Sequence, residues 1–469
     1  MELDPIFLSR LQFAFVVSFH AIFPVFTIGL ASFIAVLEGI YLKTQNPVWM
    51  KLSQFWTKVF AVVFGMGVVS GIVMAFQFGT NWSNFSYISA NFLGPILSYE
   101  VVTAFFLEAA FLGVLLFGRG KVPPGIYWMS AVLVAVGTFI SSFWILSANS
   151  WMHTPAGVEF RGELLYVTSW LEAIFNASLP YRFAHMGLAS FLTGGFVVAG
   201  VSAWYLLRGR EVEANRKALS MTLWLLLILT PLQAYVGDLH GLNTLEHQPA
   251  KVAAMEGNWE TRGNVPLLLF AWPDQENQTN HLEVGIPNLA SIILKHSPDG
   301  VVPGLDMVPR EEQPPVWVVF WSFRVMVGLG LLMIAVAVTG LVLRLRGKLW
   351  STPWYFRVLQ VMSITPFIAV LAGWFTTEIG RGPWLIYGIM TFAEGVTPSL
   401  QGWMALTTLI GYIIVYALVF SGGLYYLMRI LRDGMEYQPA HDEHSTQTTT
   451  LRAKRPFSAA DVPFEEGAR

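Results

Sequence analysis

The chain has 469 residues, of which 54% are hydrophobic and only 12% are Asp, Glu, Lys or Arg, and its mean hydropathy is +0.54. Soluble domains carry about 25% charged residues, so this composition excludes an ordinary soluble protein and indicates an integral membrane protein. The formal net charge of -2 says little, because in a membrane protein the distribution of charge matters more than its sum. The absence of cysteine excludes disulfides, thiolate-held iron–sulfur clusters, thiolate-ligated copper and covalently attached c-type haem.

Nine apolar runs are long enough to cross a bilayer as helices, which takes roughly 20 residues each. They lie near residues 12–40, 54–79, 93–117, 126–147, 182–207, 219–238, 315–343, 357–378 and 402–428. The sequence therefore predicts an all-α integral membrane protein with nine transmembrane helices. Its first residues, Met1–Pro5, are acidic and lack a basic segment, so they do not indicate a cleaved signal peptide.

The basic residues between these runs are distributed unevenly. If the N-terminus lies outside, 19 of the 28 Lys and Arg residues fall on the inner side. The positive-inside rule then predicts a periplasmic N-terminus and a cytoplasmic C-terminus. The resulting parts are helices 1–6 (1–238), a long outer loop (239–314), helices 7–9 (315–430) and a flexible cytoplasmic tail (431–469).

Four possible iron ligands are predicted to lie in the outer half of the membrane, on four different helices. His20 is in the first span, His185 opens the fifth, Met326 is about three turns into the seventh, and Glu378 ends the eighth. His20 and His185 are the only two of the nine histidines within or at the edge of a predicted span. Singly, a buried His is as often a helix–helix hydrogen bonder, and a Met is usually packing. Their common depth favours a cofactor site.

Residues 373–384 bring ionisable and aromatic side chains together at a membrane boundary, where the eighth span ends. The segment contains Trp374, Glu378, Arg381 and Trp384. A bilayer penalises ionisable side chains, so the carboxylate and the guanidinium need partners. A cofactor with a Lewis-acidic centre and negative peripheral groups satisfies both. The alternatives are that Arg381, like Arg324, reaches to the headgroups and that Trp384 is an aromatic-belt anchor.

Two carboxylates in the third span predict a proton path. Glu100 and Glu108 each cost around 3 kcal/mol at a helix centre on insertion scales, so two in one helix need a reason. Their spacing places them roughly 12 Å apart along the axis and within about a quarter turn. The alternative is a structural hydrogen-bond pair with neighbours such as Ser141, Ser142 or Thr103.

The long loop contains one further candidate pair. Lys251 and Glu256 flank a short apolar stretch that precedes Trp259, and this pattern predicts a short helix on the membrane surface. A cation and a carboxylate beside aromatic residues suit a quinol headgroup, whose hydroxyls need a hydrogen-bond partner and a proton acceptor. The alternative is ordinary solvation of loop charges.

These residues, in this order, resemble subunit I of the cytochrome bd-type quinol oxidases over roughly residues 5–430. The short outer loop resembles that of the subgroup called cyanide-insensitive oxidases. The motifs that carry the resemblance are residues 9–14 (SRLQFA), 147–151 (SANSW), 320–328 (FWSFRVMVG) and 373–384 (GWFTTEIGRGPW).

The resemblance implies three haems. His185 and Met326 would be the axial pair of a low-spin haem b, with Arg324 near it. His20 and Glu378 would each ligate one high-spin haem, a second haem b and either haem d or a further haem b. Trp374 would lie between haems, and the residues implied to neutralise propionates are Arg10 and Arg381.

The resemblance also implies roles for the remaining candidates. Glu100 and Glu108 match the family's proton-delivery acids, and Lys251 and Glu256 match its quinol-loop pair. The implied partners are ubiquinol or menaquinol, dioxygen, a second large membrane subunit and a small single-span subunit in the bacterial inner membrane. One departure is Gly382, where the familiar motif has Gln.

The implied activity is oxidation of quinol at the outer face and reduction of dioxygen to water with cytoplasmic protons, without a pump. A haem–copper oxidase is excluded, because its catalytic subunit needs about six intramembrane histidines and only two are predicted here. A b-haem electron-transfer subunit would leave His20 and Glu378 unexplained. A proton-coupled transporter would use Glu100 and Glu108, but it predicts broken helices and inverted repeats, and neither is recognisable in the sequence.

Overall fold

The computed structural model describes residues 3–435, and the predicted cytoplasmic tail, apart from its first five residues, lies outside the described residues. Within 3–435, nine helical segments are long and apolar enough to cross a membrane, which confirms the prediction of a nine-span all-α membrane protein. The spans are α1 (Pro5–Thr44), α2 (Pro47–Thr80), α4–α5 (Ala90–Phe117), α6 (Pro124–His153), α8 (Leu179–Leu207), α9 (Val212–His247), α12 (Val316–Leu345), α13–α14 (Pro353–Ile379) and α16 (Gly402–Asp433).

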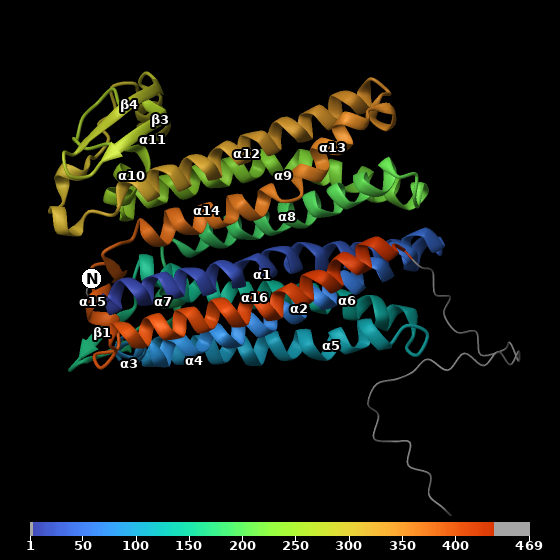
Figure 1. Ribbon diagram of the computed structural model, residues 1–469, viewed down its shortest axis with the longest axis horizontal. Helices are drawn as coiled ribbons and strands as arrows, with labels where there is room; N and C mark the ends of the chain where they lie inside the picture. The colour runs from blue at the N-terminus through green and yellow to red at the C-terminus, as the bar shows by residue number, and fades with distance from the viewer. Residues whose placement is uncertain (1–2, 436–469) are drawn as a thin grey trace, which may run out of the picture. The chain divides into compact units, whose positions relative to one another are not determined.

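Helix α1 is the central element of one half of the bundle. It packs against α2, α6, α8 and α16 (Figure 1). In the other half, α9, α13 and α14 pack against α8, and α12 packs against α9 and α14. Its first turn is capped by Asp4, whose side chain accepts a hydrogen bond from the Ile6 N–H, and Pro5 occupies the first turn.

Glycines allow α1 and α8 to cross closely. A Cβ added at Gly29 would lie 2.3 Å from the Ser190 carbonyl oxygen, and one at Gly194 would lie 2.9 Å from the Gly29 carbonyl carbon. Neither position tolerates a side chain. Small residues at such crossings let helix backbones approach in membranes, where packing rather than hydrophobicity holds helices together.

Two spans are not regular α-helices. The third consists of α4 (Ala90–Glu100), a π-helical turn (Val101–Phe105) and α5 (Phe106–Phe117). The eighth consists of α13 (Pro353–Met362) and α14 (Thr365–Ile379), which begins beside Pro366. Proline lacks a backbone N–H and disfavours helix at the preceding residue, which explains this break. No broken helix was recognised in the sequence, and the interruption between α13 and α14 is a feature that went undetected there.

The sixth span is longer than expected. Helix α9 continues to His247, so the first part of the predicted outer loop, from residue 239, is helical, and it ends where Pro249 begins α10 (Pro249–Glu256). His240 and His247 thus belong to a span, and His153 is the last residue of α6. The expectation that only two histidines lie in or at the edge of spans was wrong, because α6 and α9 continue through polar residues beyond their apolar runs.

The remaining elements are short and lie in the connections. The helices are α3 (Ser83–Ile88), α7 (Trp170–Ile174), α11 (Leu289–Lys295) and α15 (Phe392–Gly395), with single 3₁₀ turns at Leu305–Met307, Arg310–Glu312 and Leu349–Ser351. Three antiparallel hairpins pair β1 (Val158–Arg161) with β2 (Leu164–Val167), β3 (Leu267–Asp274) with β4 (Thr279–Ile286), and β5 (Trp384–Ile386) with β6 (Met390–Thr391).

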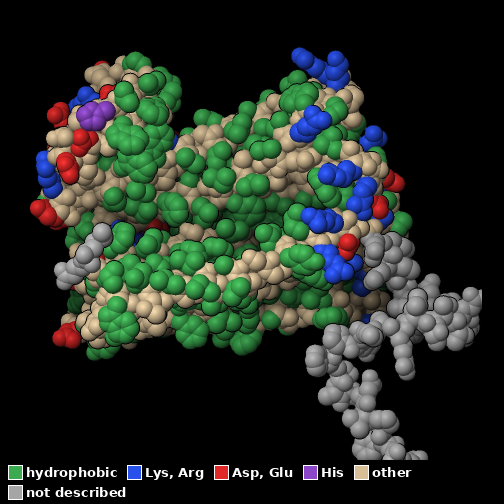
Figure 2. Space-filling view, viewed as in Figure 1, with side chains coloured by type: hydrophobic (Ala, Val, Ile, Leu, Met, Phe, Trp, Pro, Cys, Tyr) green, Lys and Arg blue, Asp and Glu red, His purple; other side chains and the backbone are tan. Residues whose placement is uncertain are grey.

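Charge is segregated along the bundle. Figure 2 shows Lys and Arg side chains gathered at the end opposite the N-terminus, while the middle of the visible face is covered by hydrophobic side chains. Such a distribution matches the predicted inner loops. Four of the basic residues counted on the inner side lie outside the described residues: Arg452, Lys454, Arg455 and Arg469.

Candidate functional site

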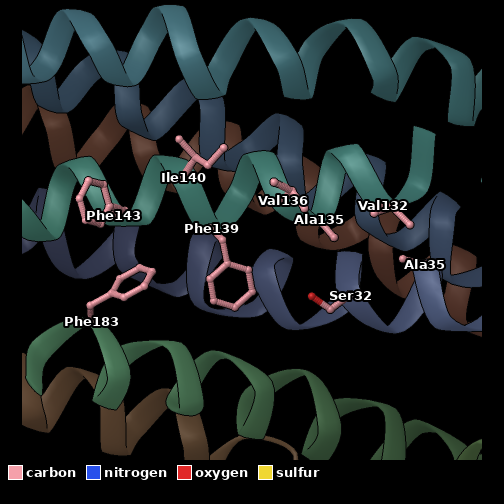
Figure 3. A pocket seen from close by; sticks show the side chains of 9 residues that line it. All are labelled: Ser32, Ala35, Val132, Ala135, Val136, Phe139, Ile140, Phe143 and Phe183. Carbon is pink, nitrogen blue, oxygen red and sulfur yellow. The ribbon is translucent and has the colours of Figure 1, made fainter. Parts of the chain in front are cut away.

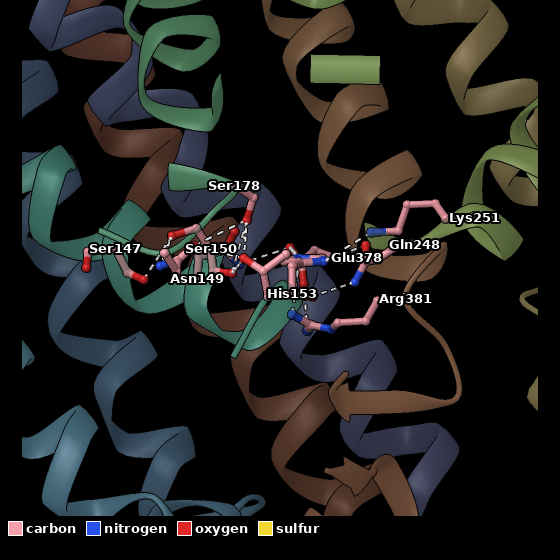
Figure 4. A network of polar contacts seen from close by, with 11 residues as sticks. Ser147, Asn149, Ser150, His153, Ser178, Gln248, Lys251, Glu378 and Arg381 are labelled. Carbon is pink, nitrogen blue, oxygen red and sulfur yellow. Dashed lines mark hydrogen bonds and ion pairs between the residues drawn. The ribbon is translucent and has the colours of Figure 1, made fainter. Parts of the chain in front are cut away.

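Glu378, at the last turn of α14, is the centre of a polar network (Figure 4). Its Oε1 accepts a hydrogen bond from Asn149 Nδ2 at 2.9 Å and lies 3.0 Å from His153 Nε2. Its Oε2 forms an ion pair with the Arg381 guanidinium at 2.7 Å. The predicted pair of charges at the end of the eighth span therefore meets directly, and α6 supplies the other two partners.

His153 connects this carboxylate to the outer loop. Its Nδ1 lies 3.1 Å from Lys251 Nζ and 3.3 Å from Gln248 Oε1, and the Gln248 amide donates to the His153 carbonyl at 2.9 Å. The His153 side chain is 1% exposed. A hydrogen-bonded chain thus runs from Lys251 on α10 through His153 to Glu378 on α14.

The network has more buried cations than anions. Arg182, Lys251 and Arg381 are all buried, and Glu378 is the carboxylate that faces them. Burial lowers the pKa of Lys251 well below its ordinary value; Arg182 and Arg381 lower it further, and Glu378 opposes them. Burial also lowers the pKa of Arg381, again opposed by Glu378. The Nε atoms of Arg182 and Arg381 have no hydrogen-bond partner among the described residues. The site therefore suits anionic groups.

His185 and Met326 lie against different helices. His185 Nε2 is 3.3 Å from Gln233 Nε2, its Nδ1 has no partner among the described residues, and its ring centroid is 5.7 Å from that of His240. Met326 faces α14, where a Cβ at Gly373 would lie 2.9 Å from its Sδ. Next to that glycine, the buried Trp374 Nε1 also lacks a partner within residues 3–435.

His20 and Arg10, both on α1, contact other residues than those of the Glu378 network. His20 Nδ1 is 3.0 Å from the Ser70 hydroxyl, and a Cβ at Gly71 would lie 3.0 Å from the imidazole Cε1. The Arg10 guanidinium stacks over the Phe392 ring at 4.3 Å. A Cβ at Gly382 would be 3.8 Å from Arg10 NH2, so the departure from the family motif adjoins this arginine.

The two loop candidates have different partners, and neither is solvated. Lys251 is 3% exposed and points to His153, whereas Glu256 Oε2 forms an ion pair with Arg324 NH2 at 2.9 Å. Arg324 also donates to the backbone carbonyls of Met255 and Leu268. The prediction of a short helix is confirmed by α10, and the alternative of solvated loop charges is wrong.

The carboxylates of the third span differ from one another in their surroundings. Ser141 donates to Glu100 Oε1 at 2.7 Å, as the structural alternative proposed. Glu108 is buried, and its Oε1 has no partner among the described residues. The π turn between them adds roughly one residue to the helix, which brings the two acids onto nearly the same face. Gly137 makes room for Glu108, since a Cβ there would lie 2.7 Å from Cγ.

Two cavities lie among the described residues, and only the second adjoins candidate site residues. An apolar pocket of about 490 Å³ lies between α1, α6 and α8 (Figure 3), and it has no group that would ligate a metal. Its lining includes Ser32, Val136, Phe139, Ile140, Phe143 and Phe183. A second cavity of about 410 Å³ adjoins Arg10, Glu312 and Trp384.

Within residues 3–435, no three His, Asp or Glu side chains gather as a site for a bare metal ion. Iron held in a porphyrin needs only one or two protein ligands, and the carboxylates of the porphyrin need cations beside them.

Three residues of the network were not identified from the sequence: His153, Arg182 and Gln248. The 147–151 motif was the available signal, because it contains Asn149 and ends two residues before His153.

Residues 3–435 combine nine candidate spans with isolated His, Met and Glu side chains and a surplus of buried cations. This combination is typical of the membrane redox proteins that hold porphyrin-bound iron within a helix bundle. Comparisons specify the family. Residues 8–435 match the family model of cytochrome bd terminal oxidase subunit I. The chain belongs to this family, and it is a multi-pass inner-membrane subunit of a quinol:oxygen oxidoreductase.

Relatives cover nearly the whole chain. It is 35% identical to cytochrome bd ubiquinol oxidase subunit 1 of Bacillus subtilis, over 93% of this chain and 95% of that protein. It is 34% identical to cytochrome bd-II ubiquinol oxidase subunit 1 of Escherichia coli, over 91% and 94%. The bd oxidase structure from Geobacillus thermodenitrificans superposes with a TM-score of 0.86 at 31% identity, covering 92% of this chain and 99% of that one. Haem and quinol are implied by the family.

Proposed function

We propose that this chain binds quinol at its outer loop and carries the haems at which dioxygen is reduced to water. The observation that carries this proposal is the hydrogen-bonded chain from Lys251 through His153 to Glu378. It joins the expected quinol residue to an expected haem ligand across three separate elements. A merely structural pair of membrane charges needs no such link to the loop.

The chain's residues fit haem groups. His185 and Met326 would hold a low-spin haem b, and His20 and Glu378 would each hold a high-spin haem, a haem b and either haem d or a further haem b. Bound there, these groups supply one-electron transfer and a coordination position for dioxygen. The unpartnered His185 Nδ1 and the buried cations of the network support this assignment.

At the quinol site, Lys251 and Glu256 have distinct tasks. The Lys251 amine, held beside His153, would hydrogen-bond a quinol oxygen and orient the ring. Glu256 is fixed by Arg324, so it would accept a hydroxyl hydrogen bond in a defined geometry and pass the proton outwards. Arg324 would position this carboxylate, and Trp374 would lie between haems.

Protons for water formation would come from the cytoplasm. Glu108 and then Glu100 would transfer them along the third span, with Ser141 orienting the second carboxyl. The π turn places both acids on nearly one face, which supports a path rather than two unrelated groups. Charge is then separated because quinol protons leave on the opposite side.

We also propose an orientation in the membrane and partner subunits for this chain. The N-terminus would be periplasmic and the C-terminus cytoplasmic, and residues 239–314 would form the outer quinol loop. A second large membrane subunit and a small single-span subunit would cover part of the apolar surface. The substrate would be ubiquinol or menaquinol; the B. subtilis and E. coli relatives described above are named as ubiquinol oxidases.

A reduced-minus-oxidised visible spectrum of the purified complex, combined with haem extraction, tests the proposal. We expect a low-spin haem b signal together with high-spin signals from two further haems. A single low-spin signal would instead indicate an electron-transfer subunit. A spectrum without haem bands would indicate a transporter and contradict the proposal.

A further inference from the structure

The β3–β4 hairpin of the outer loop has an unusually apolar exposed surface. Leu282 is 76% exposed, Val284 59% and Trp272 51%. The other exposed apolar side chains of the hairpin are Leu269, Phe270 and Ile286. A water-facing hairpin with such a surface would be an aggregation site, because exposed strand edges and apolar patches recruit other chains. We refer to these six side chains as the hairpin apolar face.

The hairpin lies beside a transmembrane helix. Strand β3 packs along the first turns of α12. There Phe270 meets Trp321 edge-on at a centroid distance of 5.1 Å, and Trp272 meets Trp317 at 5.8 Å. Trp317 is itself exposed. Tryptophans at the end of a span are typical of the membrane–water interface, so the hairpin sits at the depth of an aromatic belt.

One polar side chain of β4, that of Asn280, is directed towards the loop segment that follows α10. Asn280 donates to the Gly257 carbonyl and to Glu283, each at 2.9 Å, and accepts from the Trp259 indole at 2.9 Å. The bonds to Gly257 and Trp259 tie β4 to the loop segment that follows α10. In Figure 2 the charged side chains of this part lie at its outer edge, and the hydrophobic ones on the side continuous with the apolar band of the bundle.

The backbone also favours exposure of the apolar face. Leu282 has a φ of 55°, a left-handed conformation that is rare for a leucine, and it lies where the β3–β4 register shifts. This irregularity leaves its side chain almost fully exposed. A sequence selected only for a water-facing turn would place glycine or asparagine at such a position.

We propose that the hairpin apolar face inserts into the bilayer, at the boundary between headgroups and acyl chains, in the leaflet that surrounds the outer-loop end of the bundle. The occupant is lipid, because the face is continuous with the lipid-facing surface of α12 and aligned with its tryptophans. The hairpin thereby anchors the loop that carries α10 to the membrane. This inference does not depend on the haem or quinol assignments.

The absence of cysteine makes the test direct, since an introduced cysteine is the only thiol of this subunit. Leu282→Cys is compared with Glu276→Cys, an exposed position in the turn of the same hairpin. Each is labelled with an environment-sensitive fluorophore in the complete oxidase complex, reconstituted into nanodiscs. The unsubstituted complex, treated identically, gives the background from any partner subunit.

We expect quenching by lipids with nitroxide-labelled acyl chains to be several-fold stronger at position 282 than at 276, and quenching by aqueous iodide to show the reverse order. Equal accessibility to iodide would overturn the proposal by placing the face in water. Protection from both quenchers would also overturn it, because a protein partner would then cover the face. Val284→Cys repeats the test if the first variant fails to assemble.

Discussion

The two ring nitrogens of His153 face the two halves of the site: Nε2 lies 3.0 Å from the Glu378 carboxylate, and Nδ1 lies 3.1 Å from the Lys251 amine. One imidazole thus touches both the end of a transmembrane helix and the helix of the outer loop. Because it is fully buried, each contact is made without competition from water. His153 is therefore a positioning residue for both groups.

Replacing His153 with leucine should impair the enzyme strongly. Buried polar groups left without a partner cost about 1–3 kcal/mol each, so we expect turnover with quinol to fall by about tenfold or more. His153→Gln keeps a donor and an acceptor and should retain more activity. The measurements are kcat and KM, with the thermal unfolding midpoint as the control for folding. Equal losses in both variants would contradict the positioning role.

Replacing Glu378 with alanine should remove one high-spin haem signal while leaving the low-spin signal intact. The physical reason is that this carboxylate is the proposed ligand of a single haem, whereas His185 and Met326 hold another. The measurement is the haem-to-protein ratio with a reduced-minus-oxidised spectrum. Asn149→Ala, which removes only a hydrogen bond to the carboxylate, is the matched control and should keep the haem. An unchanged spectrum in Glu378→Ala would refute the assignment.

Neutralising Glu108 should slow turnover without weakening quinol binding. Loss of a positioned proton-transfer group typically costs about 100-fold or more, so we expect Glu108→Gln to reduce kcat on that scale at an unchanged KM. Ser141→Ala, which removes the hydrogen bond to Glu100 but keeps the carboxyl, should have a much smaller effect. A Glu100→Ala variant with full quinol oxidase turnover would exclude the proton path.

Breaking the ion pair between Glu256 and Arg324 should destabilise the loop. Removing one partner of a buried pair typically costs 3–5 kcal/mol, because the other charge stays buried, so Arg324→Leu should lower the thermal unfolding midpoint. The KM for quinol should rise as α10 shifts. Arg324→Lys keeps the charge but not the planar fork, and we expect an intermediate result. A midpoint equal to that of the unsubstituted protein would show that the pair is not structural.

The pH dependence of stability should report on Lys251. Its pKa is well below the ordinary value in the folded protein, mainly because of burial, so the unfolded chain binds the proton more tightly. Between the folded pKa and the unfolded value of about 10.4, stability contributed by this residue therefore rises with pH. Lys251→Met should remove that rise, which thermal unfolding at several pH values in this window measures. Parallel profiles for both proteins would contradict the prediction.

Much of the fold was predictable because a bilayer leaves few choices. A span needs a long apolar run with internally satisfied backbone groups, and all nine runs became helices. The interruptions were not recognised: Pro366 marks the break in the eighth span, whereas nothing obvious in residues 101–105 marks the π turn. Helix ends were also misplaced where polar residues continue a helix into the loop, as in α9.

Several residues of the site were predictable from the sequence, but the hydrogen bonds and ion pairs between them were not. Glu378 and Arg381 are predictable because charges at a membrane boundary demand partners. Lys251 is predictable because a cation and a carboxylate beside aromatic residues suit a quinol headgroup. Which partners they have depends on the packing of α6 and α10, which no local pattern reveals. His153 lies six residues beyond the predicted end of the fourth span, and Arg182 is the first residue of the predicted fifth span. Polar side chains at such positions are normally solvated, so no local pattern singles them out.

The glycine crossing of α1 and α8 has a consequence for the two histidines on these helices. Gly29 follows His20 by nine residues, and Gly194 follows His185 by nine residues, in helices that are expected to run in the same direction. At 1.5 Å per residue, both imidazoles lie about 13.5 Å along their helices from one shared contact point. The crossing therefore fixes the positions of the two imidazoles along the bundle relative to one another. A side chain added at either glycine would separate the helices there and change that relative position.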